Sequence, residues 1–214
     1  MNAAPRRICA VSGSRADYGL LLPVLRAIQR HPSLELQLAV TGSHLEHRFG
    51  NTVDAIRDDG FSVDARVPLG LEDDSVATIT RALGRCVSGF AAELARLRPD
   101  LLLVLGDRYE ILGAVQAALI ARIPVAHIAG GDVTEGAFDD AIRHAISKLA
   151  HLHFVTHDRA RRRVRQLGEA DGRVFVTGSP GIDQILETPL LVRSELERRL
   201  GMALQTRNLA LTFH

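Results

Sequence analysis

The sequence predicts an α/β fold in which a doubly wound parallel sheet carries helices on both faces. Short runs rich in Val, Ile and Leu alternate with longer segments whose apolar residues recur at helical spacing. Two of the short runs, residues 101–105 and 125–128, are apolar throughout, which is typical of strands covered on both faces and places them at the sheet centre. Residues 34–38 alternate between apolar and polar side chains, so we expect this strand nearer an edge.

The individual elements follow from this alternation in chain order. The predicted strands are residues 7–12, 34–40, 61–67, 101–105, 125–128, 152–155 and 174–176. The predicted helices are residues 18–30, 45–59, 75–97, 110–121, 139–150 and 158–167. Gly60 and Gly168 stand where glycine commonly ends a helix, and Pro32, Pro99 and Pro124 each separate a helix from the next strand.

The C-terminal part of the chain differs in character. Two short helical stretches, residues 182–187 and 191–201, flank Pro189, and residues 208–212 predict a further strand that no helix follows. We therefore expect an N-terminal α/β domain over residues 1–180 and linker helices over residues 181–207. Residues 208–214 would then be the first strand of a truncated second domain.

The composition excludes several classes of protein. The chain has 214 residues, of which 46% are hydrophobic and 24% charged, so disorder, collagen and coiled coil are excluded. Lys and Arg number 26 against 25 Asp and Glu, and this near balance gives no reason to expect nucleic acid as a partner. Lys148, the only lysine, lies outside any glycine-rich loop, which excludes a Walker-type nucleotide hydrolase.

The cysteines and the apolar runs indicate where the protein works. Cys9 and Cys86 have neither CxxC nor Cys/His spacing, so they predict core packing in a reducing cytoplasm and no disulfide framework. The N-terminal apolar run, residues 8–11, is too short for a signal peptide. The most apolar helix, residues 111–121, is far shorter than a bilayer span. We therefore expect a cytoplasmic protein without a membrane partner.

The loops after the predicted strands carry the polar residues, and ligands of open parallel sheets bind at that edge. Neither a GxGxxG nor a GxSxG pattern occurs, so no dinucleotide cofactor and no serine-hydrolase elbow are expected. The remaining carboxylates and histidines suit acid–base work on a sugar or hydroxy acid, with arginines neutralising a phosphate. These residues are Asp17, Asp107, Asp132, Asp139, Asp140, Arg15, Arg108, Arg143, His44 and His144.

Structural roles stay open for several of these residues. Asp17 and Asp139 each stand where an N-cap of the next helix is expected, and Arg143 and His144 suit a helix surface. The histidine-rich stretch 151–157 has spacing compatible with metal binding, but no third class of ligand clusters with it. We therefore predict a structural role for these histidines and no metal site.

Several short motifs follow one another in a characteristic order between residues 8 and 214. They are Arg15-Ala16-Asp17-Tyr18-Gly19, Gly106-Asp107-Arg108-Tyr109-Glu110, His127 to Asp132, Thr134-Glu135-Gly136, Asp140-Ala141-Ile142-Arg143-His144-Ala145-Ile146 and Gly178-Ser179-Pro180-Gly181. Together they resemble the hydrolysing UDP-N-acetylglucosamine 2-epimerases, in the branch that supplies N-acetylmannosamine or its 2,4-diacetamido analogue to sialic-acid-type sugar synthesis. The resemblance implies a Rossmann-like first half of a glycosyltransferase-B-type two-domain fold, with the nucleotide-binding second domain only begun at residues 208–214.

The resemblance also implies a reaction and roles for particular residues. UDP would be eliminated across C1–C2 of the UDP-sugar, and water would then be added with inversion at C2. Asp107 and Asp132 would flank the reacting carbons, while Arg15 would face the diphosphate. The expected catalytic residues are Asp17, Asp107, Asp132, Asp139, Arg143 and His214. The expected substrate-binding residues are Arg15, His44, Arg108, Gly131, His144 and Ser179.

Two further readings of the same sequence are a glycosyltransferase of the same fold and a non-catalytic nucleotide-sugar-binding fragment. The carboxylate set disfavours the transferase, because passing the sugar to an acceptor needs no such set. The resemblance implies a homodimer or homotetramer for a complete protein. Because the uridine and diphosphate contacts of the family lie in its second domain, we expect this chain alone to turn over UDP-N-acetylglucosamine negligibly.

Overall fold

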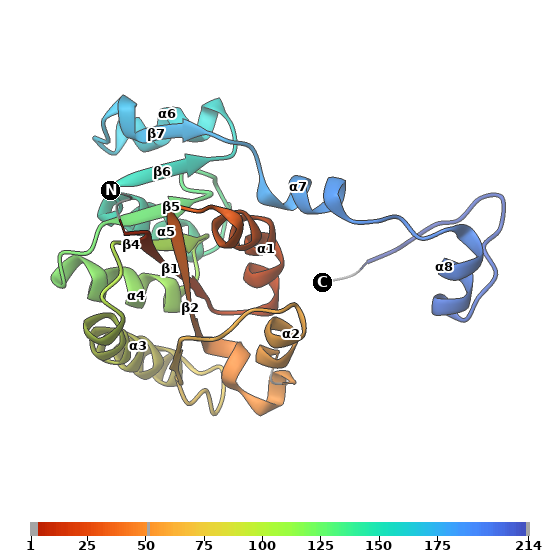
Figure 1. The fold of residues 1–214 in the computed structure, drawn as a ribbon, viewed down its shortest axis with the longest axis horizontal. Helices are drawn as coiled ribbons and strands as arrows, with labels where there is room; N and C mark the ends of the chain where they lie inside the picture. Colours follow the sequence, from red (N-terminus) through yellow and green to blue (C-terminus); the bar gives the residue numbers. More distant parts are fainter. Residues whose placement is uncertain (1–3, 51, 213–214) are drawn as a thin grey trace.

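A computed structural model describes residues 4–50 and 52–212 of the chain, and it contains a parallel sheet with helices packed against it (Figure 1). The strands are β1 (Arg6–Ser12), β2 (Leu34–Thr41), β3 (Ala65–Val67), β4 (Leu101–Leu105), β5 (Val125–Ile128), β6 (Leu152–Val155) and β7 (Val174–Val176). The helices are α1 (Arg15–Arg30), α2 (Val53–Asp58), α3 (Val76–Leu97), α4 (Tyr109–Ile120), α5 (Asp139–Leu149), α6 (Asp158–Gln166), α7 (Pro180–Glu187) and α8 (Arg193–Leu200).

The seven strands lie in the order β3-β2-β1-β4-β5-β6-β7, and each neighbouring pair is parallel. The predicted doubly wound sheet is therefore confirmed, with β4 at its centre and β2 next to an edge. The chain moves outward from β1 in one direction and from β4 in the other. The topological switch point, where ligands of such sheets bind, consequently lies between the carboxyl ends of β1 and β4.

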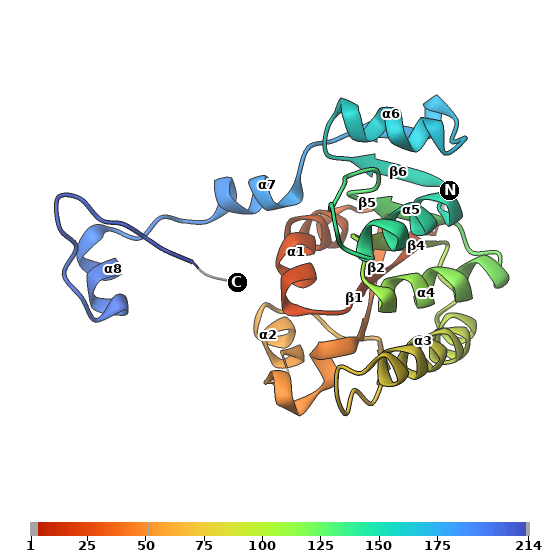
Figure 2. The ribbon, with the colours of Figure 1, turned by 180° about the vertical axis from the view of Figure 1, so that it is seen from behind.

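Two apolar cores hold helices to opposite faces of the sheet. Side chains of α3, α4 and α5 pack on one face, with Phe90 and Ile111 fully buried. Those of α1 and α2 pack on the other, with Leu21 and Leu25 fully buried. Figures 1 and 2 show α3 and α4 side by side, separated from α1 and α2 by the strands β1 and β2.

The local sequence determines where helix α1 begins beside the switch point and which of its faces is buried. Tyr18, Leu21, Leu25 and Ile28 recur at helical spacing and are all buried against the sheet. The helix begins at Arg15, earlier than predicted, because the Ser14 hydroxyl accepts a hydrogen bond from the amide of Asp17 and caps the first turn.

Two predicted elements were wrong in extent. The helix expected over residues 45–59 is divided into short 3₁₀ turns (Gly42–Leu45 and His47–Phe49) followed by α2. Gly50 ends the second turn in a left-handed conformation with φ +82°, which a helix interior does not accommodate. The strand expected over residues 61–67 pairs only from Ala65, because the Asp64 side chain accepts from the amide of Leu38.

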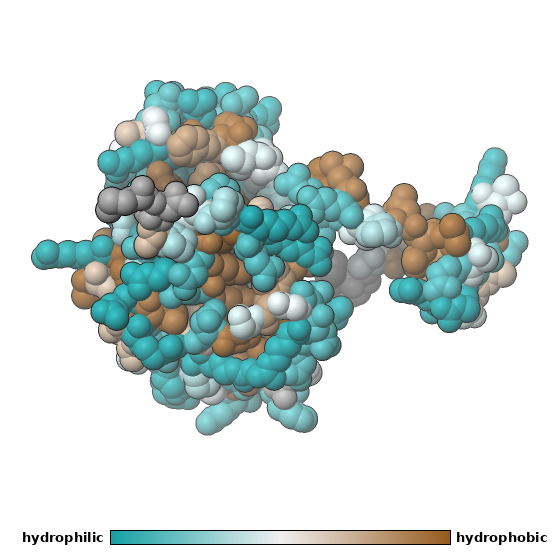
Figure 3. Space-filling model, viewed as in Figure 1, coloured by the Kyte–Doolittle hydropathy of each residue, from teal (hydrophilic) through white to brown (hydrophobic). Residues whose placement is uncertain are grey.

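The tail beyond the sheet also differs from expectation. Residues 208–212, predicted as a strand, lie in no helix or strand, and Leu209 and Leu211 are 93% and 90% exposed. A strand requires a neighbour for its backbone hydrogen bonds, and none of the described strands lies beside this segment. Helix α7 packs against α1, while its apolar residues Ile182, Ile185 and Leu186 are exposed and form part of the brown surface seen on the tail in Figure 3.

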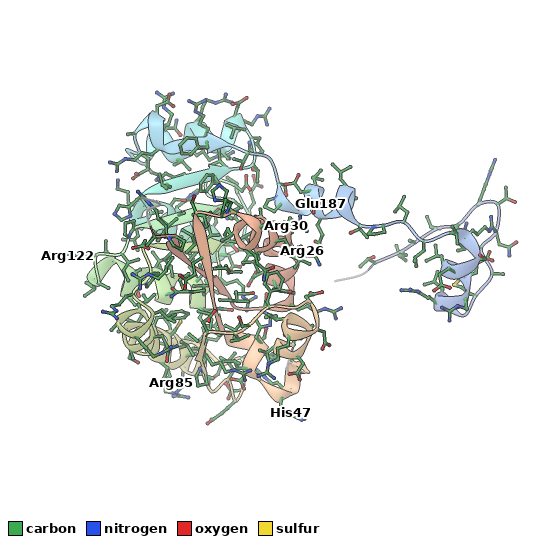
Figure 4. All side chains as sticks on the ribbon, viewed as in Figure 1. Arg26, Arg30, His47, Arg85, Arg122 and Glu187 are labelled. Carbon is green, nitrogen blue, oxygen red and sulfur yellow. The ribbon has the colours of Figure 1, made fainter. Side chains whose placement is uncertain are left out.

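The surface is charged on many sides. Arg30 on α1, Arg85 on α3 and Arg122 after α4 are exposed at different parts of the molecule (Figure 4). None of the helices formed by the described residues is both long and apolar enough to cross a membrane.

Replacing Gly131 by Ala should destabilise the protein strongly. Gly131 has φ +78°, and a Cβ atom there would overlap the backbone oxygen of Ala160 and lie 2.9 Å from Val164. Gly136 has φ +81° with open space around it. In urea unfolding we expect Gly136→Ala to lose about 1 kcal/mol from backbone strain alone, and Gly131→Ala to lose at least about 3 kcal/mol. Equal losses for the two variants would contradict the overlap at Gly131.

Candidate active site

A cluster of buried charge lies at the switch point between β1 and β4. Glu110, in the first turn of α4, is fully buried, and its Oε1 accepts a hydrogen bond from Arg108 Nε at 2.5 Å. Asp17, in the first turn of α1, places its Oδ2 3.8 Å from the same nitrogen. One guanidinium group therefore joins carboxylates from the first turns of two different helices, at the point of the fold where ligands of such sheets bind.

The loops after β1 and β2 close over Glu110. A Cβ atom at Gly13 would lie 2.7 Å from Glu110 Oε1, and one at Gly42 would lie 2.6 Å from the Gly13 carbonyl oxygen. Gly42 also has φ +57°, a conformation that side chains rarely adopt. Glycine at both positions therefore allows the backbone to approach the carboxylate. Glu110 was missed as a candidate, although an acidic residue opening the otherwise apolar helix α4 is a signal that could have identified it.

The cluster carries more negative than positive charge. Asp17 Oδ2 and Glu110 Oε2 are buried without a hydrogen-bond partner among the described residues. Burial raises the pKa of Asp17 to about 6, even though Arg108 and the Ser14 hydroxyl favour its ionised form. Asp17 can therefore hold or release a proton close to neutral pH, which is the property required of an acid–base group.

A second ion pair lies at the carboxyl end of β4. Gly106 turns the chain with φ +80°, and the next residue, Asp107, receives a hydrogen bond on Oδ2 from Arg143 Nη2 of α5. The side chains of Asp107 and Arg143 are 21% and 11% exposed. Arg143 Nε is buried and has no partner among the described residues. The pair therefore fixes one oxygen of Asp107 and keeps the carboxylate partly open to a ligand.

The remaining carboxylates lie further along the same edge of the sheet. Asp132, after β5, accepts a hydrogen bond from the Thr156 hydroxyl at 2.7 Å and lies 3.4 Å from His157 Nε2. Asp139 is half-buried and is the first residue of α5, so the N-cap position belongs to Phe138 before it. His144 Nε2 lies 3.5 Å from Asp140 one helical turn earlier.

Two residues expected to bind substrate have scaffold roles in this structure. His44 is fully buried, and its Nε2 and Nδ1 lie 2.9 Å from Ser12 Oγ and 2.7 Å from Thr52 Oγ1. Its ring therefore ties the loop after β2 to neighbouring hydroxyls. Gly131 is buried against α6, and its carbonyl accepts a hydrogen bond from Arg163 at 2.8 Å. Contact of either residue with a substrate stays a prediction.

The other expected site residues are spread along the crevice edge. Arg15 is exposed at the start of α1, and Ser179 is the half-buried N-cap residue of α7. His214, expected to be catalytic, lies outside the described residues. The convergence of Arg15, Asp17, Asp107, Asp132 and Arg143 on one ligand stays a prediction, while the two ion pairs show that the loops of β1, β4 and α5 present charge at this edge.

The histidines of residues 151–157 and the two cysteines make contacts within the fold. His151 Nδ1 accepts from the amide of Val125, and His157 Nδ1 accepts from the amide of Ala160 and caps α6. Burial raises the pKa of both Cys9 and Cys86 to about 12, so neither thiol is ionised at neutral pH. Within residues 4–50 and 52–212, no group of three or more His, Cys, Asp or Glu residues is arranged to hold a metal ion.

The fold and these contacts define a Rossmann-like α/β protein with acid–base and cationic groups at its switch point. Residues 26–214 match the family model described as UDP-N-acetylglucosamine 2-epimerase, and the chain belongs to that family. The family membership expected from the sequence motifs is therefore confirmed.

The chain is similar to curated members of this family over almost its whole length. It is 38% identical to the GDP/UDP-N,N'-diacetylbacillosamine 2-epimerase (hydrolyzing) of Campylobacter jejuni over 209 residues, which cover 98% of this chain and 54% of the relative. It is 36% identical to the polysialic acid biosynthesis protein P7 of Escherichia coli, covering 98% and 53%. The chain thus spans about half the length of the curated relatives it matches.

Solved structures share the fold. The UDP-GlcNAc 2-epimerase from Neisseria meningitidis bound to UDP-GlcNAc aligns with a TM-score of 0.74 at 22% identity, covering 92% of this chain and 51% of that one. A UDP-N-acetylglucosamine 2-epimerase from Listeria monocytogenes aligns with a TM-score of 0.76 at 19% identity, covering 86% and 48%. At these identities the likeness shows a common fold.

Replacing Asp17 by Asn should stabilise the protein most at alkaline pH. Because the pKa of Asp17 is raised from 3.8 to about 6 on folding, the folded state resists ionisation, and stability falls as pH rises through that interval. The amide lacks this penalty, so we expect Asp17→Asn to gain up to about 3 kcal/mol at pH 8. The gain should shrink as pH falls from 7 to 4.

Urea unfolding across this pH range measures the difference between Asp17→Asn and the unsubstituted protein. Asp54→Asn is the control, because Asp54 lies on the exposed surface of α2 beside Arg57. Its effect should stay within a few tenths of a kcal/mol. A pH-independent effect of Asp17→Asn would show that Asp17 ionises normally in the folded protein.

Proposed function

We propose that the protein containing this chain is a hydrolysing 2-epimerase. It converts UDP-N-acetylglucosamine, or a 2,4-diacetamido analogue, to UDP and the corresponding 2-epimeric sugar of the N-acetylmannosamine type. The product would enter sialic-acid-type sugar synthesis. Family membership supports the class of reaction, and the Asp107–Arg143 pair at the carboxyl end of β4 is the structural observation that carries the proposal.

The reaction requires a base at C2 and stabilisation of charge at C1. In our proposal, Asp107 lies beside the reacting carbons, with one oxygen fixed by Arg143 and the other available to substrate. Removing a weakly acidic C–H proton needs such a positioned carboxylate. As UDP leaves, positive charge grows at C1, and a fixed carboxylate nearby offsets it. Asp132 and Asp139 are the further carboxylates that we assign to this step.

The diphosphate requires cationic groups at the same edge. We assign this contact to Arg15, which is exposed at the N-terminus of α1, where the helix dipole also favours an anion. Arg108 contributes positive charge nearby but is bound by Glu110 and Asp17. We therefore propose that Arg108 and Glu110 hold the loops of the site in place without contacting substrate. Asp17, whose pKa is raised to about 6, would take up or release a proton in the acid–base reaction.

Relatives named for different substrates match this chain at comparable identity. The epimerases named for diacetylbacillosamine are 38% and 37% identical to it, and the UDP-N-acetylglucosamine 2-epimerase of Neisseria meningitidis is 33% identical. We therefore propose the shared feature, a UDP-activated 2-acetamido sugar, as the substrate class. Assembly into a homodimer or homotetramer belongs to the same proposal and rests on the family resemblance.

Turnover in D₂O should place deuterium at C2 of the released sugar. Elimination removes the C2 proton, and the later addition of water takes a deuteron from solvent at that carbon. The complete protein that contains this chain is mixed with UDP-N-acetylglucosamine, and separately with the UDP-activated 2,4-diacetamido sugar, without an acceptor. UDP is then measured enzymatically, and the sugar is analysed by NMR. Equal amounts of UDP and C2-deuterated epimer are the expected result.

The alternatives give different products in the same assay. A glycosyltransferase releases UDP only when an acceptor is added, and its sugar keeps the C2 hydrogen. A nucleotide-sugar-binding fragment binds the UDP-sugar without releasing UDP. Either result would overturn the proposed reaction.

Replacing Asp107 by Asn should lower UDP release by about 10²–10⁴-fold, as expected for loss of an acid–base group. Asp100→Asn is the matched control, because Asp100 precedes the same strand at its opposite end and is held by the backbone amide of Arg7 at 2.7 Å. We expect the control to keep turnover within about threefold, since its bond lies away from the crevice edge. Comparable losses in both variants would remove Asp107 from the mechanism.

A further inference from the structure

Behind Asp107 lies a histidine to which neither the predicted site nor the proposed reaction gives a role. His127, on β5, is fully buried. Its Nε2 lies 2.8 Å from the carbonyl oxygen of Gly106, the residue that precedes Asp107, and its Nδ1 lies 3.1 Å from Ser147 Oγ. Both nitrogens are therefore engaged, one by the β4–α4 turn and the other by α5.

The chemistry of these partners fixes the proton on the ring. A carbonyl oxygen can only accept, so Nε2 carries the hydrogen and donates it to Gly106. Burial lowers the pKa of His127 to about 4, so the ring is neutral in the folded protein and Nδ1 has a free lone pair. Ser147 donates its hydroxyl hydrogen to that lone pair. The result is one directed chain of hydrogen bonds from Ser147 through His127 to Gly106.

Helix α5 holds the β4–α4 turn at two points. Arg143 and Ser147 are one helical turn apart and therefore lie on the same face of α5. Arg143 binds the Asp107 carboxylate directly, while Ser147 acts on the preceding carbonyl through His127. A Cβ atom at Gly130 would lie 2.7 Å from Ser147 Oγ and 2.9 Å from His127 Nδ1, so the glycine there leaves room for the contact.

We propose that His127 is a positioning residue for Asp107: its Nε2–H holds the Gly106 carbonyl and so fixes the direction in which Asp107 leaves β4. The catalytic consequence rests on the proposed epimerase function, while the positioning itself does not. Gly106 has φ +80°, and its amide donates a hydrogen bond to the carbonyl oxygen of Ile128 at 3.1 Å. The bond from His127 holds the other side of the same residue, so the peptide before Asp107 keeps one orientation.

The neighbouring strand supplies a matched control for a merely structural role. His153 is the register partner of His127, lies on the same face of the sheet and is equally buried. Its Nε2 lies 3.3 Å from Glu169, which is located before β7 and away from the β4–α4 turn. Leucine at either position replaces the ring by an apolar side chain without a donor. Only the change at 127 should alter Asp107.

The first test measures the position of the Asp107–Arg143 pair by NMR of the 214-residue chain, without substrate. In His127→Leu, hydrogen exchange of the buried Arg143 Nε–H with water should accelerate at least about tenfold, and the Asp107 carboxyl signal should shift. His127→Gln, whose amide can donate to Gly106, should keep exchange within about threefold. His153→Leu should leave both signals unchanged.

Unchanged exchange in His127→Leu, or an equal change in His153→Leu, would overturn the proposal. If His127→Leu does not fold, His127→Phe decides the question, because it keeps a planar ring of similar size but has no donor to the Gly106 carbonyl. Exchange at Arg143 Nε–H should then accelerate as expected for leucine. Unchanged exchange in this variant would again overturn the proposal.

The second test follows UDP release from UDP-N-acetylglucosamine by the complete protein that contains this chain. A displaced Asp107 should lower kcat about a hundredfold in His127→Leu while KM changes less than about threefold, and His127→Gln should restore most of the loss. A rise in KM alone would contradict a positioning role. If the unsubstituted protein releases no UDP, the epimerase proposal fails, whereas the exchange measurements still decide whether His127 positions Asp107.

Discussion

A buried carboxylate needs a positively charged partner, and for Glu110 that partner is Arg108, whose Nε lies 2.5 Å from Glu110 Oε1. That pairing brings the loop after β4 against the loops after β1 and β2, whose glycines leave space for the carboxylate. Burial raises the pKa of Asp17 to about 6, because the same guanidinium, already bound to Glu110, offsets the cost of burying this second carboxylate only in part. The raised pKa of Asp17 is thus a consequence of the buried Arg108–Glu110 pair that holds these loops together.

The opposite wall of the crevice depends on α5. This helix packs into the sheet through buried Ile146 and carries Arg143 and Ser147 toward the end of β4. Its position is therefore transmitted to Asp107 by packing, by an ion pair and by a chain of neutral hydrogen bonds. Arg143 thus binds the Asp107 carboxylate itself, whereas the neutral hydrogen bonds of Ser147 and His127 act on the peptide before it.

Much of the fold was predictable because it depends on local patterns. The strands at residues 101–105, 125–128, 152–155 and 174–176 have the predicted bounds. Short apolar runs between helices are typical of strands in a parallel sheet that helices cover. Residues 208–212 have equally strong strand character but are not in a strand, because pairing requires a partner that a local pattern cannot supply. The helix expected over residues 45–59 was wrong because Gly50 interrupts an otherwise suitable pattern.

The site was predictable in location and only partly in its contacts. Topology requires the loops after β1 and β4 to meet, so Asp17 and Asp107 could be found from the sequence. Arg143 was also expected among the catalytic residues, but its pairing with Asp107, 36 residues away, depends on the packing of α5 and was not identified from the sequence. His44 and His127 both follow the pattern of polar residues near strand ends, yet both are buried with neutral rings. A sequence shows which polar side chains follow the strands and so reach the carboxyl edge of the sheet. Burial decides which of these side chains are open to a ligand and which contact other side chains or loops of the site. In this crevice the second group, formed by Glu110, His44 and His127, is as large a part of the site as the first.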